Sequence, residues 1–164
     1  MTPLFDARSP DLARWRAFTD RVMGGVSEAS TGLQTLDGEP ALVIRGTVRM
    51  ENNGGFIQMA TPLQAGESAA LGEASGLALR LHAAAGTPVG VHLRSSDLTA
   101  PWQAWRGEIT ADGGWQAVVL RWGDFNPYRT DASLVPARVS RIGIVAIGRP
   151  GPVAIGLGRL APAA

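Results

Sequence analysis

Both histidines, three arginines and two tryptophans lie between residues 80 and 106, where they could bind a polar ligand. If segments 76–83 and 88–95 pair as neighbouring strands, strand alternation places their polar residues on one face, which segment 102–109 extends. The predicted binding face contains Arg80, His82, His92, Arg94, Trp102, Gln103, Trp105 and Arg106. Aromatic rings stack and guanidinium forks orient oxyanions, so this face suits a sugar, a carboxylate or an extended peptide.

Two alternatives for this face stay open. Trp102 and Trp105 have opposite parity in a strand, so one of them can belong to the core. Arginines on an exposed sheet face can also serve solubility alone.

Candidate catalytic groups are present but poorly arranged. His92 with Ser95 or Ser96 and Asp97 would resemble a triad, yet a strand and the loop after it do not generally fold back into such a relay. Glu51 and Glu108 are strand-adjacent carboxylates that nothing in the sequence pairs for glycoside hydrolysis. We therefore predict no catalytic residues and no enzyme activity.

Metal and nucleotide sites are also not predicted. The chain has two histidines, His82 and His92, and each has an arginine two residues away that would repel a cation. With no cysteine, thiolate sites are excluded. The glycine-rich loops lack the lysine and the strand-loop-helix context of a phosphate-binding loop. We expect no metal and no cofactor.

Turn-forming residues divide the chain into short strands. Its 21 glycines and 11 prolines leave little room for long helices. Residues Leu77, Leu79 and Leu81 alternate with polar or small ones, as in a strand with one core face. Strands are predicted at 40–50, 55–61, 76–83, 88–95, 102–109, 114–122, 140–148 and 152–160. This spacing predicts an all-β fold, an antiparallel β-sandwich.

One domain, residues 1–164, accounts for the whole chain, with its core at about residues 5–160 and a frayed tail at 161–164. Single helical turns are predicted in two places. Ser9 is a candidate N-cap with Pro10 at the first helical position, and segment 122–128 has the composition of a turn.

Charge and hydropathy limit the partners. A formal net charge of +1 with scattered basic residues predicts no nucleic-acid binding. All 15 basic residues are arginine, and with the abundant alanine this indicates a GC-rich bacterial genome. No apolar run is long enough for a signal peptide or a membrane span, so we expect a soluble, cytoplasmic bacterial protein without membrane insertion.

Two glycine doublets carry a family resemblance. Trp15, the segment TDRVMGGVS (19–27) and the segment GTVRMENNGGFIQM (46–59) together resemble the signature of the complex I intermediate-associated 30 kDa protein family. The later segments WQAWRGEI, GGWQAVVLRWGDFNPY and SRIGIVAIGRPGPVAIGLGRL follow in the family's order. The matching motif residues are Trp15, Asp20, Met23, Gly24, Gly25, Ser27, Asn52, Asn53, Gly54, Gly55 and Phe56.

The resemblance implies a galactose-binding-like jelly roll, and a role like that of the eukaryotic members, which are non-catalytic chaperones in complex I assembly. We therefore expect a binding or assembly-factor module with a protein partner or small ligand, respiratory complex assembly being possible. The alternative is a carbohydrate-binding module that binds a saccharide on its aromatic and arginine face. We expect the two doublets to act first as scaffold and to approach each other, with Asp20 or Ser27 bonding across.

Overall fold

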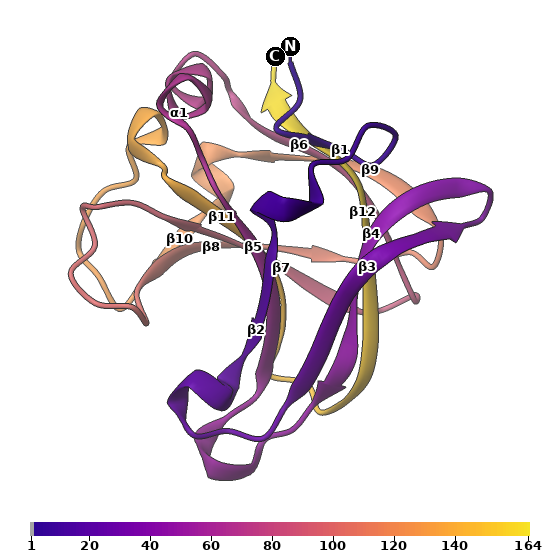
Figure 1. The fold of residues 1–164 in the computed structure, drawn as a ribbon. Helices are drawn as coiled ribbons and strands as arrows, with labels where there is room; N and C mark the ends of the chain where they lie inside the picture. Colours follow the sequence, from indigo (N-terminus) through magenta and orange to yellow (C-terminus); the bar gives the residue numbers. More distant parts are fainter. Residues whose placement is uncertain (1) are drawn as a thin grey trace.

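Figure 1 shows the fold in a computed structural model, which describes residues 2–164 apart from the side chain of Asn53. Two antiparallel sheets pack against each other. Sheet A has the order β3 (Glu28–Leu36), β4 (Glu39–Val48), β12 (Gly151–Ala163), β6 (Gly76–Ala83) and β9 (Trp115–Arg121), with β1 (Phe5–Asp6) paired to β12. Sheet B has the order β10 (Asn126–Tyr128), β8 (Ala104–Thr110), β7 (Pro88–Arg94), β11 (Arg141–Ile147), β5 (Phe56–Pro62) and β2 (Arg16–Thr19). The predicted antiparallel β-sandwich is confirmed.

The core lies between the sheets and is built from alternate residues of their central strands. Burying these apolar side chains is the main term that holds the two layers together. Sheet A contributes Leu77, Leu79 and Leu81 from β6, and sheet B contributes Val89, Val91 and Leu93 from β7, all at most 3% exposed. The alternation read from the sequence is therefore correct for both strands.

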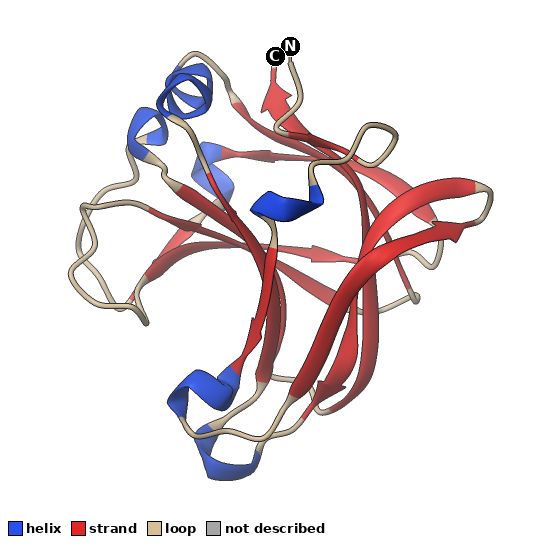
Figure 2. Ribbon diagram, in the orientation of Figure 1, coloured by secondary structure: helices blue, strands red, loops and turns tan. Residues whose placement is uncertain are grey.

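Short helices lie at the ends of strands (Figure 2). They are the α-helix α1 (Ala65–Gly72) and the 3-10 turns η1 (Leu12–Arg14), η2 (Asp20–Met23), η3 (Glu51–Asn53), η4 (Trp122–Asp124) and η5 (Pro136–Arg138). Within residues 2–164, none of these helices has both the length and the apolar character needed to cross a membrane. The turn predicted within 122–128 is confirmed by η4.

Two predictions, the Ser9 N-cap and the frayed tail, are wrong, and strand β3 is missing from the predicted strands. The first helical turn begins after Asp11 rather than Ser9, because the Ser9 N–H donates to the Asp6 carbonyl and holds Ser9 in an earlier turn; the Asp11 side chain makes no capping hydrogen bond. The tail 161–164 is not frayed, because β12 continues to Ala163 beside β6, and Ala161 and Ala163 are buried. Strand β3 was not predicted because its segment EASTGLQTL is mostly exposed and lacks apolar alternation.

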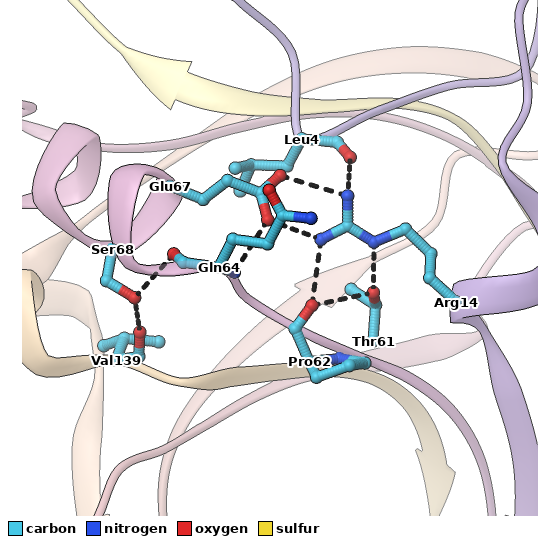
Figure 3. Close-up of polar contacts among 8 residues, drawn as sticks. All are labelled: Leu4, Arg14, Thr61, Pro62, Gln64, Glu67, Ser68 and Val139. Carbon is cyan, nitrogen blue, oxygen red and sulfur yellow. Dashed lines mark hydrogen bonds and ion pairs between the residues drawn. The ribbon is translucent and has the colours of Figure 1, made fainter.

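A polar cluster around Arg14 joins η1 to α1 and β5 (Figure 3). The Arg14 guanidinium donates to both carboxylate oxygens of Glu67 at 3.0 and 2.7 Å, and to the carbonyls of Leu4 and Pro62. Glu67 also accepts from the Gln64 N–H at the start of α1. Burial raises the pKa of Glu67, but the bonds from Arg14 and Gln64 outweigh it and hold that pKa below its ordinary value. The cluster fixes the N-terminal segment against the rim of the sandwich.

Candidate functional site

A groove of about 900 Å³ lies on the outer face of sheet B, the face turned away from the core. Strand alternation sends Val91 and Leu93 of β7 into the core and His92 and Arg94 outward into the groove. The floor is low because Gly143 of β11, which pairs with His92, has no side chain. A Cβ at Gly143 would come within 2.9 Å of the Gln58 side chain, so the glycine leaves room for that neighbour.

Two half-buried arginines lie over aromatic rings in the groove. The Arg106 guanidinium is 3.4 Å from the centre of the Tyr128 ring, and that of Arg141 is 4.7 Å from the centre of the Phe18 ring. Such cation–π contacts hold an arginine side chain while its donors stay available. Burial lowers the pKa of both guanidinium groups, and Tyr128 partly offsets this for Arg106.

Arg94 has a different role, as it organises the loop that follows β7. Its guanidinium donates to the carbonyls of Ala100, at 3.2 Å, Pro101, at 3.0 Å, and Gln103. The Gln103 side chain bonds the same loop through the N–H groups of Thr99 and Ala100. This loop carries Trp102 at the edge of the groove, so Arg94 positions the rim.

His92 is neutral at physiological pH. Burial, followed by the charge of the cross-strand neighbour Arg106, lowers the pKa of His92 to about 4. Its ring is therefore a neutral donor and acceptor in the groove floor rather than a cation.

Three large apolar side chains stand exposed on the groove's rim. Val22 is 71% exposed, Trp102 59% and Met23 57%. Val22 and Met23 lie on η2, within the first signature segment, and Trp102 lies on the loop held by Arg94. Apolar side chains this exposed next to a hollow are typical of a binding surface.

The signature residues meet at the buried carboxylate of Asp20, which is 0% exposed. Its Oδ1 accepts from the Ser27 N–H at 2.9 Å, and its Oδ2 accepts from the Gly55 N–H at 2.5 Å, the Phe56 N–H at 3.1 Å and the Ser27 hydroxyl. Burial raises the pKa of Asp20, but these bonds outweigh it and hold the pKa below its ordinary value. The prediction that the doublets approach each other through Asp20 or Ser27 is confirmed.

The glycines of both doublets make this approach possible. A Cβ at Gly25 would lie 2.4 Å from the Asp20 Oδ1, and one at Gly54 would lie 2.7 Å from its Oδ2. Gly24 and Gly55 adopt φ of +89° and +128°, which side chains disfavour. Asn52 takes the left-handed conformation and donates to the Gly24 carbonyl at 3.2 Å, joining η3 to η2.

The remaining signature residues are divided between core and groove. Trp15 is buried and packs edge-on against Phe5, whereas Met23, Gly54, Gly55 and Phe56 line the groove. The side chain of Asn53 lies outside the described part of the structure. The scaffold built on Asp20 therefore forms one end of the groove.

The predicted binding face is not one surface, because β6 and β7 belong to different sheets. Arg80 and His82 lie on the outer face of sheet A, where Arg80 pairs with Glu39 at 2.5 Å and His82 contacts Asp37 at 2.7 Å. His92, Arg94, Trp102, Gln103 and Arg106 line the groove on sheet B. Trp105 is 1% exposed and belongs to the core, where its Nε1 donates to the Ala132 carbonyl.

The sequence did not point to several groove residues because strands β2, β5, β10 and β11 bring them from distant segments. The added lining residues are Phe18, Val22, Gln58, Pro101, Ala104, Tyr128, Arg141, Gly143, Val145, Ile147 and Gly148. A usable signal was the glycine at an outward position in the segments PVGVHLRS and RIGIVAIG, where a small residue hollows a sheet face.

The candidate triad does not form. His92 faces the groove, whereas Asp97 is held by Arg138 at 2.7 Å and by the Ser95 hydroxyl at 3.3 Å. Over residues 2–164, the structure contains no cluster of three or more histidine or acidic side chains suited to a metal ion. The groove's chemistry is that of recognition: guanidinium donors, a neutral imidazole, an amide and apolar rims.

Solved structures with the same fold include carbohydrate-binding modules and parts of agarases. A family 11 carbohydrate-binding module from Clostridium thermocellum, in complex with a β-1,3-1,4-mixed-linked tetrasaccharide, has a TM-score of 0.76 at 12% identity, covering 99% of this chain and 95% of that one. A family 30 carbohydrate-binding module gives 0.59 at 14% identity, covering 90% and 82%. An exo-β-agarase gives 0.60 at 12% identity, covering all of this chain and 26% of the enzyme. At these identities the similarity shows the fold alone.

Sequence comparison identifies the family. No curated protein matches the chain. The family model of complex I intermediate-associated protein 30 matches residues 4–157, a span that includes the Asp20 scaffold, the groove and every strand as far as Leu157 in β12. The chain belongs to the complex I intermediate-associated protein 30 (CIA30) family.

Proposed function

We propose that this domain is a non-catalytic assembly-factor module that binds an extended segment of a partner protein in the groove on sheet B. The observation that carries the proposal is the composition of the groove: arginine, aromatic and methionine side chains surround a preformed hollow. Family membership supports the same role, because an assembly factor acts by binding subunits. We propose that the partner is a subunit of a respiratory complex.

The groove has the residues that protein interfaces favour. Aromatic residues, methionine and arginine are enriched in interface cores, and tryptophan, tyrosine and arginine dominate their hot spots. Trp102 and Met23 supply exposed apolar contacts at the rim, and Arg106 stacked on Tyr128 supplies a pre-oriented fork. A rigid sheet floor presents these groups with little ordering cost on binding.

A saccharide is the second candidate, since the family 11 module with this fold is described in complex with a tetrasaccharide. Sugar binding relies on open aromatic faces on which pyranose rings stack. In this groove, Arg106 and Arg129 approach the Tyr128 ring at 3.4 and 5.3 Å, and Arg141 covers Phe18. Trp102 is the well-exposed ring that a sugar could use. The covered rings favour the protein ligand.

Affinity capture from the native host, with wild type and with a variant whose groove is filled by a large side chain, tests the proposal. Gln58→Trp places a large ring over the glycine floor without entering the core. Val119→Trp is the matched control, because Val119 is 44% exposed on β9 of sheet A. Thermal melts first establish that both variants fold.

We expect wild type and Val119→Trp to retain the same respiratory-complex subunits, and Gln58→Trp to lose them. Equal retention by Gln58→Trp would show that the groove is not the binding site. If wild type captures no host protein but binds added mixed-linked tetrasaccharide, the second candidate is favoured instead.

A further inference from the structure

The groove carries positive charge that its own lining does not neutralise. Arg94, Arg106 and Arg141 line it, and among the lining residues no aspartate or glutamate is found in the described chain. His92 is neutral and adds no charge. A lining with three cations and no anion raises the local concentration of anionic groups.

Arg106 and Arg141 are the two cations with donors to spare. In the part of the chain that the structure describes, neither forms an ion pair, and the Nε of Arg106 is buried without a hydrogen-bond partner. Leaving a buried donor unpaired is unfavourable in the free protein. A ligand carboxylate that turns the Arg106 guanidinium toward the groove would satisfy it. Arg94 differs, because loop carbonyls already take up its guanidinium.

The acidic residue that follows Arg106 on the same face of β8 does not pair with these arginines. Glu108 lies two residues beyond Arg106 on β8, on the outward side, where it pairs across with Gly90. It is exposed, does not line the groove and makes no ion pair within residues 2–164. The neighbouring cation Arg129 adds positive charge beside Tyr128.

We propose that the segment bound in the groove is acidic, and that its carboxylates pair with Arg106 and Arg141; this rests on the proposed function. The register sets their spacing. Arg106 on β8 pairs with His92 on β7, and His92 pairs in turn with Gly143 on β11. Arg141 lies two residues before Gly143 on β11. The Cα atoms of Arg106 and Arg141 are therefore two strands and two residues apart, about 12 Å. An extended peptide spans this in three or four residues. The bound segment therefore has two acidic residues so spaced, with apolar residues between them for the rim.

Titration by two-dimensional NMR with matched peptides tests this inference. The probe is the peptide Ac-SELTFES-NH2, and its control is Ac-SQLTFQS-NH2, in which both carboxylates become amides of the same shape. The mixed-linked tetrasaccharide is a third probe. We expect the acidic peptide to shift the amides of His92, Gly143 and Val145 and the Trp102 indole, with an affinity that falls as salt is added.

Arg141→Gln should lower the affinity for the acidic peptide by about tenfold or more, because it removes one fork and leaves a carboxylate unpaired. Arg45→Gln is the matched control: it removes the same charge from an exposed site on β4 of sheet A and should leave the affinity unchanged.

The outcomes separate this inference from the proposed function. Equal affinity of both peptides, mapped to the groove, would overturn the acidic ligand but keep the peptide-binding role. Shifts caused by the tetrasaccharide alone would overturn both. If none of the three probes shifts the NMR signals of the groove residues, the acidic-ligand inference is overturned.

Discussion

Asp20→Asn should destabilise the domain far more than its small chemical change suggests. The substitution keeps the shape of a side chain that is 0% exposed but replaces one acceptor oxygen by an NH2 donor. Whichever way the amide turns, it faces an N–H of Ser27 or the N–H groups of Gly55 and Phe56. Each buried donor left unsatisfied costs about 1 to 3 kcal/mol, so we expect a loss of about 2 to 5 kcal/mol in unfolding free energy.

Urea unfolding at pH 7, with the unfolding free energy obtained from the midpoint and slope, measures this loss. Asp11→Asn is the matched control, because Asp11 is exposed and its side chain caps nothing, and it should stay within about 0.5 kcal/mol of wild type.

The pH dependence gives a second readout. The folded pKa of Asp20 lies below its ordinary value of 3.8, so the carboxylate's contribution is present above that pH and is lost as the pH falls through the folded pKa. The difference in unfolding free energy between wild type and Asp20→Asn should therefore become smaller at low pH. An Asp20→Asn protein within about 0.5 kcal/mol of wild type at pH 7 would refute the scaffold role.

Three further predictions follow from other contacts. Gly54→Val should cost about 1 to 3 kcal/mol or prevent folding, because its Cβ would lie 2.7 Å from the Asp20 carboxylate. Its control, Gly66→Ala in α1, where no atom lies within 4 Å of the added Cβ, should be neutral or stabilising; thermal melts measure both variants. Arg14→Met should lower the unfolding free energy, measured in urea at pH 7, by about 1 to 3 kcal/mol. Its control is Arg8→Met, which should lower it by under about 1 kcal/mol because the Arg8 side chain is 75% exposed. Equal losses would contradict the role of the cluster in Figure 3. The His92 ring should titrate by NMR near pH 4, and titration near pH 6.5 would contradict its burial. Because the folded pKa lies below the ordinary value of 6.5, the unfolding free energy of wild type should fall by up to about 3 kcal/mol between pH 6.5 and pH 4. His92→Gln should make this fall smaller.

Local pattern was enough to predict most strands and their faces. The alternation in segments 76–83 and 88–95 correctly separated core leucines and valines from outward arginines and histidines. The hydrogen bonds across the two glycine doublets were also predictable, because short polar side chains and glycines are suited to joining loops.

Which strands share a surface depends on pairings that local pattern does not contain. Strands β6 and β7 follow each other in the chain, yet β6 pairs with β9 and β12 while β7 pairs with β8 and β11. The predicted face therefore divides into the ion-paired cluster around Arg80 and the groove around Arg106. Arg141 reaches the groove only through the long-range pairing of β11 with β7.

Photocrosslinking from the groove's rim tests the central claim most directly. A benzoylphenylalanine is placed at the position of Val22, an exposed residue on the groove's rim, where it leaves the floor open, and, in a matched protein, at the position of Val119 on sheet A. Both proteins are expressed in the native host and irradiated, and the joined peptides are identified by mass spectrometry. We predict that position 22 joins an acidic segment of a respiratory-complex subunit and that position 119 joins none. Crosslinks to the same subunit from position 119 but not from position 22 would contradict the groove as the binding site.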